Sequence, residues 1–289
     1  MAQNDDAPGW VIPVMRTGYG ARGVTYIILG VLAFLAAWTG GDAEGTREAL
    51  AKLRDMPFGL IGLWLIALGF FCYAIWRLIC AFYDLEDHGT DAKGLIARTG
   101  QTVTGLIHAG LGISVVRLAT GSSSESAGDG GGAQSATSWV LSMPFGKWIV
   151  IAVGLITIGA GIYYGWKGIA EKYKEHLRCT SLTERLDPVV KAGLIAHGVV
   201  IALIGTFLIY AGLNTDPGQA GGIGKAFDTV RSQPYGQFLL GALGIGTVAF
   251  AIYCFIEAIY RFVPRLAEPD LTSLADAAEG RVRAAARSL

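Results

Sequence analysis

Six long hydrophobic stretches alternate with short polar segments along the chain. Each stretch holds 18 to 25 consecutive residues without Asp, Glu, Lys or Arg. A helix needs roughly 20 apolar residues to cross the hydrocarbon core of a bilayer. Because lipid offers no partner for unpaired backbone groups, each stretch is predicted to be a transmembrane α-helix. We therefore expect an all-α membrane protein with helices at about 20–40, 57–83, 98–119, 145–170, 190–213 and 235–262.

The same two-helix pattern occurs three times. Glycines with the same spacing mark the odd-numbered helices, tyrosines 90 residues apart mark the even-numbered ones, and a Pro-aromatic-Gly step precedes each even-numbered helix. The glycines are Gly18, Gly23 and Gly30, then Gly100, Gly105 and Gly112, then Gly193, Gly198 and Gly205; the tyrosines are Tyr73, Tyr163 and Tyr253; the steps begin at Pro57, Pro144 and Pro234. Two crossings per unit return the chain to its starting side, so the units are parallel repeats. We expect three helical hairpins in a pseudo-threefold arrangement, with repeats at 16–90, 91–178 and 179–262.

The nine repeated glycines are expected to mediate helix packing, because small residues let transmembrane backbones approach closely. The connections on the side opposite the termini carry apolar residues at helical spacing, at 46–55 and 223–230, with 139–141 in the equivalent place of the second unit. Short helices lying on the membrane surface and ending at the next proline are predicted there. The Gly- and Ser-rich segment 121–135 is predicted to be a flexible insertion.

Basic residues predict the orientation of the helices. Sixteen of the 23 Lys and Arg residues fall on the side of both termini. By the positive-inside rule, the N-terminal tail (1–15) and the C-terminal tail (263–289) are expected to be cytoplasmic. The first helix has counterparts in the third and fifth, so we expect it to be retained rather than cleaved as a signal peptide.

Composition agrees with a membrane protein and excludes several functions. The chain is 52% hydrophobic and 16% charged, with a formal net charge of zero. The absence of excess basic charge argues against a nucleic-acid partner. No metal or nucleotide motif occurs, so no cofactor and no metal are predicted. The expected partners are the lipid bilayer and either another membrane protein or further copies of the chain.

The sequence GYGARGVTYIILG at 18–30, followed by MPFG at 56–59 and repeated twice in diverged form, resembles an uncharacterised bacterial family of integral membrane proteins. The domain of that family is of unknown function. The resemblance extends from Arg16 to about Arg261 and is strongest in the first unit; Thr104 and His197 stand where the first unit has Arg22. It implies a bacterial plasma (inner) membrane and a six-helix bundle, and it implies no activity and no catalytic residues.

Ionisable residues inside the predicted helices are the candidate functional residues. His108 lies about two turns into its helix. In one interpretation it relays protons or binds a ligand; in the other it is a neutral imidazole that hydrogen-bonds a neighbouring helix. His197 has the same alternatives nearer a helix start. Both interpretations stay open for each histidine.

Two sets of equivalent residues add further candidates. Arg77, Lys167 and Glu257 occupy the same position in the three units. Either Glu257 bridges Arg77 or Lys167, or all three side chains extend to the membrane interface. Tyr73, Tyr163 and Tyr253 either line the pseudo-threefold axis or belong to packing and an aromatic belt.

Two functions follow from this pattern. The first is a structural or accessory membrane protein that docks or stabilises partners, and it fits the low polar content and the glycine packing. The second is a channel or carrier for a small solute or protons along the axis, and it fits the ring-like repeat and His108. No catalytic residue is predicted, and the first function is preferred.

Overall fold

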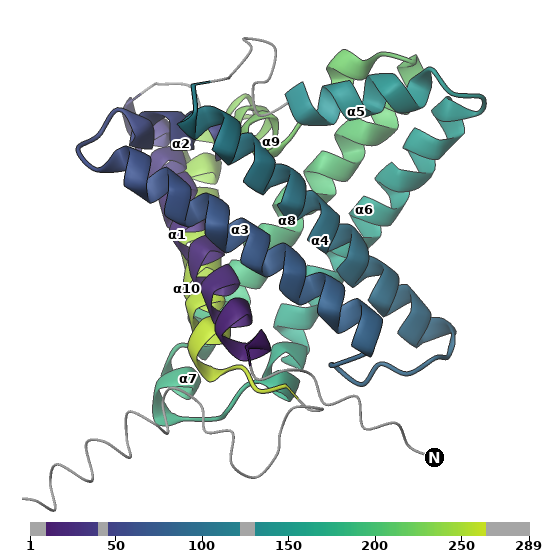
Figure 1. The fold of residues 1–289 in the computed structure, drawn as a ribbon. Coiled ribbons are helices and arrows are strands. Elements are labelled where there is room, and N and C mark those ends of the chain that lie inside the picture. The colour runs from purple at the N-terminus through teal and green to yellow at the C-terminus, as the bar shows by residue number, and fades with distance from the viewer. Residues whose placement is uncertain (1–9, 40–45, 122–130, 264–289) are drawn as a thin grey trace, which may run out of the picture.

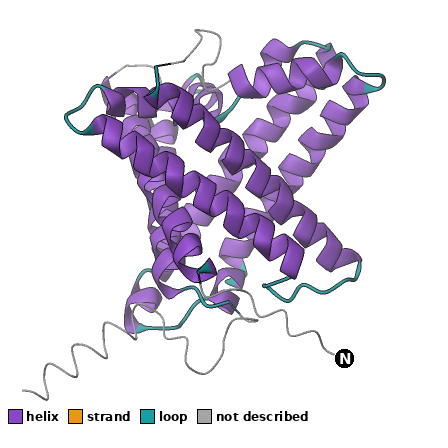
Figure 2. Ribbon diagram, viewed as in Figure 1, coloured by secondary structure: helices purple, strands orange, loops and turns teal. Residues whose placement is uncertain are grey.

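Six long helices form the body of the protein. The computed structural model describes residues 10–39, 46–121 and 131–263. Six helices in these ranges are long and apolar enough to cross a membrane: α1 (Val11–Thr39), α3 (Gly59–Tyr83), α4 (Ala92–Ala119), α6 (Gly146–Ile169), α8 (Asp187–Asn214) and α10 (Gly236–Tyr260). The described part of the chain is nearly all helical, and its only β-type pairing is an isolated bridge between Leu177 and Arg261 (Figure 2).

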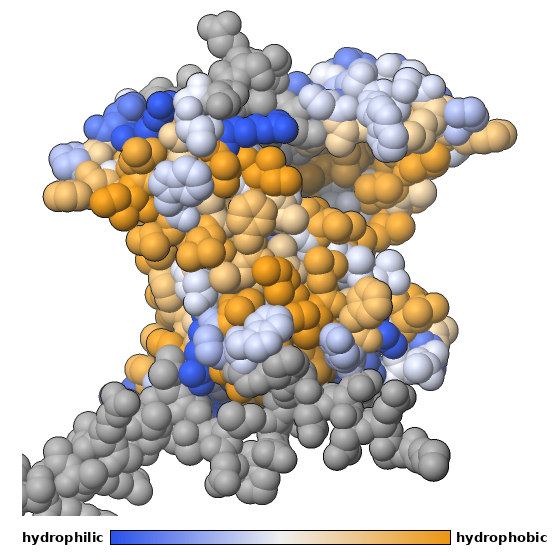
Figure 3. Space-filling model, in the orientation of Figure 1, coloured by the Kyte–Doolittle hydropathy of each residue, from blue (hydrophilic) through white to orange (hydrophobic). Residues whose placement is uncertain are grey.

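The long helices run between two polar ends of the molecule. Hydrophobic side chains cover the surface between these ends (Figure 3). α1 begins and α10 ends at the same end, where η1 (Lys172–His176) and α7 (Ser181–Arg185) also lie; we call it the terminal end (Figure 1). The short helices α2 (Thr46–Arg54), α5 (Gly131–Leu141) and α9 (Ile223–Arg231) lie at the opposite end. In the chain, the short 3-10 helix η2 (Pro217–Gln219) comes between α8 and α9.

Several predicted helix ends differ from those in the structure. α1, α4 and α8 begin at Val11, Ala92 and Asp187, earlier than the hydrophobic stretches indicate. The Asp91 carboxylate caps α4 by accepting a bond from the Gly94 N–H at 2.8 Å. The predicted insertion at 121–135 is too long, since 131–135 belong to α5; 122–130 and the tail 264–289 lie outside the described residues.

The Pro-aromatic-Gly steps are tight turns with the same backbone in each unit. The aromatic residue has a left-handed conformation, with φ of 64° at Phe58, 62° at Phe145 and 61° at Tyr235. The following glycine passes close to the preceding short helix. A Cβ there would lie 1.7 Å from the Leu53 carbonyl oxygen at Gly59, 2.0 Å from that of Val140 at Gly146, and 1.8 Å from that of Arg231 at Gly236. Only glycine fits this approach, which explains why the motif recurs.

The long helices pack in a cyclic order that follows the units. The second helix of each unit packs against the first helix of the next, so α3 lies on α4, α6 on α8 and α10 on α1. Within a unit, α1 packs on α3 and α8 packs on α10. The helices of the second unit, α4 and α6, have no such packing, and they cross and diverge in Figure 1. The cyclic arrangement of the three units is therefore open between α4 and α6.

Equivalent residues of the three units show which packing contacts are missing between α4 and α6. A Cβ on Gly18 would lie 2.6 Å from the Tyr73 backbone, and one on Gly193 would lie 2.4 Å from the Phe250 backbone. The equivalent Gly100 has nothing within 4 Å, and Tyr163 is 55% exposed whereas Tyr73 is fully buried. We call this opening the unit 2 seam and define it by the exposed residues Gly100 and Val103 of α4 and Gly159 and Tyr163 of α6.

The other repeated glycines lie against neighbouring helices. A Cβ would come within 3.1 Å of another helix at each of them: Gly23 (Phe255 ring, 2.7 Å), Gly30 (Gly244 oxygen, 2.7 Å), Gly105 (Ala74 oxygen, 3.1 Å), Gly112 (Phe71 ring, 3.1 Å), Gly198 (Gly161 oxygen, 2.5 Å) and Gly205 (Gly154 oxygen, 2.8 Å). Close backbone approach at these positions replaces the hydrophobic driving force that lipid cannot supply. Gly100 is the exception among the nine, in keeping with the seam.

Candidate functional site

Buried and half-buried polar and aromatic side chains from all six long helices meet inside the bundle. Hydrogen bonds, ion pairs and ring contacts connect them into one group, which we call the central cluster. Its members are Tyr19, Arg22, Tyr26, Tyr73, Arg77, Glu86, Gln101, His108, Tyr164, Lys167, His197, Phe250, Tyr253, Glu257 and Arg261. The cluster is the strongest candidate site because buried charges in a membrane protein are costly and therefore need a reason.

The Glu86 carboxylate joins four segments at one side of the cluster. Arg261 donates from Nη2 to Glu86 Oε1 at 2.6 Å and from Nη1 to Glu257. Arg77 Nη1 lies 3.4 Å from Glu86 Oε1, and Gln101 Nε2 donates to Glu86 Oε2 at 2.9 Å. Glu86 thus connects the α3–α4 loop, in which it lies, to α3, α4 and the end of α10.

The surroundings of Glu86 control its protonation and that of His88. Burial opposes ionisation of Glu86, but Arg261, a hydrogen bond from His88 and Arg77 outweigh it and hold its pKa well below the usual range. His88 Nε2 lies 3.3 Å from Glu86 Oε2, and this hydrogen bond raises the pKa of His88 against the opposing effect of burial. Glu86 is therefore a carboxylate at neutral pH.

Tyrosine hydroxyls bind the arginines of the cluster. The Tyr73 hydroxyl accepts hydrogen bonds from Arg22 Nη1 at 2.7 Å and from Arg77 Nε at 2.9 Å. Arg77 Nη2 also donates to the Tyr19 hydroxyl at 3.2 Å, and the Tyr19 and Tyr73 rings meet edge to face with centroids 5.1 Å apart. Two guanidinium groups thus share a single phenol oxygen.

The equivalent residues Arg77, Lys167 and Glu257 all join the cluster, but without the predicted direct bridge. Glu257 is fully buried and forms its ion pair with Arg261, one turn further along α10. Lys167 Nζ donates to the Tyr253 hydroxyl at 3.0 Å, and that hydroxyl donates to Glu257. Arg77 pairs with Glu86 instead. Of the two alternatives, the direct bridge is absent because Tyr253 stands between Lys167 and the carboxylate and Arg261 pairs with Glu257 in place of Arg77. Extension of all three side chains to the interface does not hold either, since Glu257 is fully buried.

Both candidate histidines are packed against aromatic rings. His108 Nδ1 is 2.8 Å from the Thr104 carbonyl oxygen of its own helix, and its ring lies 4.5 Å from the Tyr73 ring. His197 stacks on Phe250 with centroids 3.7 Å apart and meets the Tyr164 ring edge-on at 5.0 Å. Each ring is 8% exposed. A proton-relay role for either histidine stays a prediction.

The three equivalent tyrosines separate into two environments. Tyr73 and Tyr253 are buried in the cluster, whereas Tyr163 lies on the surface, with its ring 5.8 Å from that of Trp166. The neighbouring Tyr164 takes the inner position in α6. The repeat alignment cannot distinguish two consecutive tyrosines, and α6 lacks the packing against its own unit that buries the other two.

Arg22 and Arg261 are the most informative residues that sequence reasoning left without a role. Arg22 is 3% exposed and Arg261 is 7% exposed. A charged residue within the first hydrophobic helix was the available signal for Arg22. No pattern indicates that Arg261, beyond the last apolar stretch, would turn back into the bundle.

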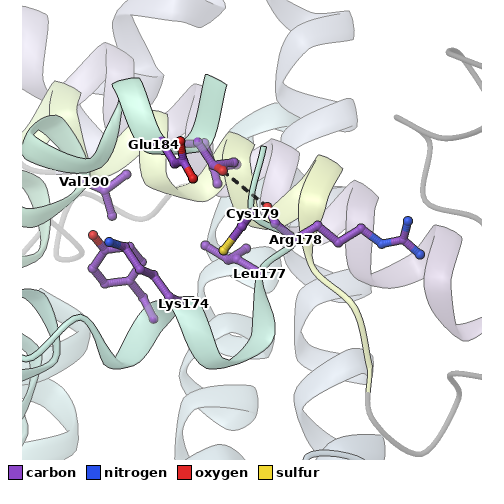
Figure 4. Close-up of a pocket in the computed structure, with 9 residues that line it drawn as sticks. Lys174, Leu177, Arg178, Cys179, Glu184 and Val190 are labelled. Atoms are coloured by element: carbon purple, nitrogen blue, oxygen red, sulfur yellow. Dashed lines mark hydrogen bonds between the residues drawn. The ribbon is translucent and has the colours of Figure 1, made fainter. Parts of the chain in front are cut away.

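A small pocket lies at the terminal end, lined by η1, α7, α8 and α10 (Figure 4). Its volume is about 90 Å³, well below the range of roughly 300–1,000 Å³ typical of small-molecule sites. The Arg178 side chain extends away from the other lining residues (Figure 4). In the ranges that the structure describes, no three His, Cys, Asp or Glu side chains are grouped to hold a metal ion.

Comparison with known proteins places the chain in a family. The model of Domain of Unknown Function 1206 matches it three times, at residues 17–84, 99–171 and 192–261. Uncharacterized protein YxxB of Bacillus subtilis (strain 168) is 30% identical over 257 residues, which cover 87% of this chain and 92% of the relative. No solved structure matches the chain. The chain is thus a member of the DUF1206 family and carries the family's domain three times, once for each two-helix unit.

Proposed function

We propose that this protein is a non-enzymatic accessory protein of the bacterial plasma membrane, with both termini in the cytoplasm, that docks a transmembrane helix of a partner membrane protein at the unit 2 seam. The observation that carries the proposal is the break in the cyclic packing. In the first and third units the faces equivalent to the seam are covered by the other helix of the unit. In the second unit they are exposed.

Small residues on both sides of the seam support a helix as the occupant. Within the six long helices, glycines at which a Cβ would meet nothing within 4 Å are Gly20 of α1, Gly100 and Gly110 of α4, and Gly159 and Gly165 of α6. Four of these five lie on the two helices that border the seam. Transmembrane helices associate where small residues allow their backbones to approach.

The bonding inside the central cluster favours a non-enzymatic role. Glu86 and Glu257 are both engaged by Arg261, so neither carboxylate is poised as a general base. A path for solutes or protons along the axis has less support. The rings of His197 and Phe250 stack with centroids 3.7 Å apart inside the bundle, and the charge of Arg22 beside Phe250 disfavours cations.

Site-specific photo-crosslinking in native membranes tests the proposal. A benzophenone amino acid replaces Tyr163 at the seam or, as the matched control, Tyr210 on α8; both tyrosines are 55% exposed. We expect one discrete protein adduct at Tyr163, which mass spectrometry identifies, and none at Tyr210. Lipid adducts alone at Tyr163, or the same products at both positions, would overturn the proposal. An adduct of twice the chain mass would replace the separate partner by a second copy.

A further inference from the structure

Arg22 is a buried cation in α1, directly before the charge-free apolar stretch of that helix, and it is 3% exposed. Its side chain is packed among aromatic rings, with the guanidinium carbon 4.5 Å from the Tyr73 ring centroid and 5.5 Å from that of Phe250. Rings stabilise such a cation only in part.

Arg22 has no carboxylate partner among the described residues. Its Nη1 donates to the Tyr73 hydroxyl, its side chain also forms a hydrogen bond with Tyr26, and its buried Nε has no hydrogen-bond partner. A guanidinium has five N–H donors and cannot lose its charge in a protein. The side chain therefore retains bonding capacity that the chain itself does not satisfy.

The remaining charges of the central cluster do not compensate Arg22. The carboxylates of Glu86 and Glu257 are shared by three other cations, Arg77, Arg261 and, through Tyr253, Lys167. Four cations thus face two carboxylates within the hydrogen-bonded network. An uncompensated charge buried away from water is strongly unfavourable, so a counter-ion is expected.

We propose that Arg22 binds an anionic group, a carboxylate or a phosphate, within the central cluster. A guanidinium binds both groups through paired N–H donors in one plane, and it is the side chain best suited to do so in a dry site. The repeat supports a single site per chain. The positions equivalent to Arg22 are Thr104 and His197, and neither carries a permanent charge.

Tyr26 and Tyr164, whose rings flank His197 beside Arg22, each keep a small exposed part. Tyr164 belongs to α6, one of the two helices that border the unit 2 seam. The anion of the proposed site is either a free ion or the headgroup of a lipid. This site does not depend on the proposed partner helix.

The binding test uses the full-length protein in phosphatidylcholine nanodiscs. Inorganic phosphate and acetate are titrated separately while thermal unfolding is followed by tryptophan fluorescence. We expect saturable stabilisation with one anion per chain in the wild type and in R117Q, the control with an exposed arginine on α4. R22Q should bind at least about tenfold more weakly, because the charge-assisted bonds are lost. R22K, which keeps the charge without the planar fork, should fall between the two.

A second arm distinguishes the source of the anion. In nanodiscs that contain phosphatidylglycerol, native mass spectrometry of the released protein should show one retained anionic lipid in the wild type and none in R22Q if a headgroup fills the site. Added phosphate then has no effect in those nanodiscs. If neither the free anions nor the lipid bind in a manner that depends on Arg22, and circular dichroism shows that R22Q is folded, the proposal is overturned. If R22Q does not fold, R22K decides, and wild-type affinity in R22K overturns the guanidinium site.

Discussion

Arg261, at the end of α10, donates a hydrogen bond to Glu86 in the α3–α4 loop at 2.6 Å, although the two residues lie 175 positions apart in the chain. This contact fastens the third unit to the first at the terminal end. Nearby, backbone bonds from Arg178 to Tyr260 and from Phe262 to His176, each 3.1 Å long, fasten the segment after α6 to the same end of α10. The terminal end is thus tied together across all three units, while α4 and α6 stay apart within the membrane-spanning region.

Replacing Glu86 with Gln is expected to destabilise the protein. The substitution leaves Arg261, whose side chain is 5% exposed, with only Glu257 as an ionic partner. Removing one partner from a buried ion pair typically costs about 3–5 kcal/mol. The free energy of unfolding in detergent, measured by titration with SDS, should fall by an amount of this order.

Glu175 provides the control for that measurement. It pairs with Lys172 at 2.5 Å, but its side chain is 53% exposed. Solvent screens an exposed ion pair, so E175Q should change the unfolding free energy little. Equal losses in E86Q and E175Q would show that Glu86 is not the anchor of the network.

His88 is expected to make stability depend on pH. Its pKa is raised by the hydrogen bond to Glu86 and by Asp84, against burial and Arg77. Because the folded state holds the His88 proton more tightly than the unfolded chain does, protonated His88 stabilises the fold. This contribution is complete below the unfolded His88 pKa of about 6.5 and is lost as pH rises through the folded pKa. The wild type should therefore exceed H88Q in stability at pH 5.5, by less than about 1 kcal/mol for this partly exposed pair.

At pH 8.5 the difference between wild type and H88Q should shrink. Glu86 stays ionised across this range because its pKa lies well below the usual value, so it does not add its own titration. Unfolding midpoints of both proteins at the two pH values provide the measurement. A difference that grows with pH would contradict the predicted ion pair.

Equivalent glycines offer a test of the open arrangement. Alanine at Gly18 or Gly193 would place a methyl group within 2.6 Å of the backbone of a neighbouring helix. Such overpacking typically costs about 1–3 kcal/mol. At Gly100 a methyl group meets nothing within 4 Å, so G100A should be neutral or slightly stabilising. Unfolding of the three variants in detergent makes the comparison, and a large loss in G100A would mean that α4 and α6 pack together in solution.

Substitutions at two adjacent residues of the turn before α6 should change stability in opposite directions. G146A would bring a Cβ to 2.0 Å from the Val140 carbonyl oxygen, so the turn must distort and stability should fall. F145G removes a side chain from a left-handed position, which relieves a strain of order 1–3 kcal/mol. Because the Phe145 ring is exposed, its loss costs little packing. Destabilisation by F145G comparable to that by G146A would mean that the ring, rather than the backbone, holds the turn.

The elements of the fold follow from local pattern, and for that reason they are predictable. Hydrophobic length predicts the six spans, repeated glycines and tyrosines predict the three units, and helical spacing predicts α2 and α9. The Pro-aromatic-Gly steps are also a local pattern. The reason for their glycine, a carbonyl oxygen that a Cβ at Gly59 would approach too closely, is visible only in the structure.

The central cluster depends on contacts that no local pattern encodes. Glu86 lies in a polar loop and Arg261 beyond the last span, where solvated side chains are the normal expectation, and only the cyclic order of the helices brings them together. The exposure of Tyr163 likewise follows from the missing packing between α4 and α6. Repeat symmetry predicts that the three units pack in the same way, so it cannot predict that the second unit packs differently.

Native mass spectrometry of the protein, released gently from its own membranes, tests directly whether the seam is a docking site. We predict a complex in which a second membrane protein is bound in a fixed ratio. G159L fills a seam position that has nothing within 4 Å, so it should remove that subunit while leaving the chain folded. Release of the wild-type chain with no bound protein, or a partner that G159L leaves in place, would contradict docking at the seam.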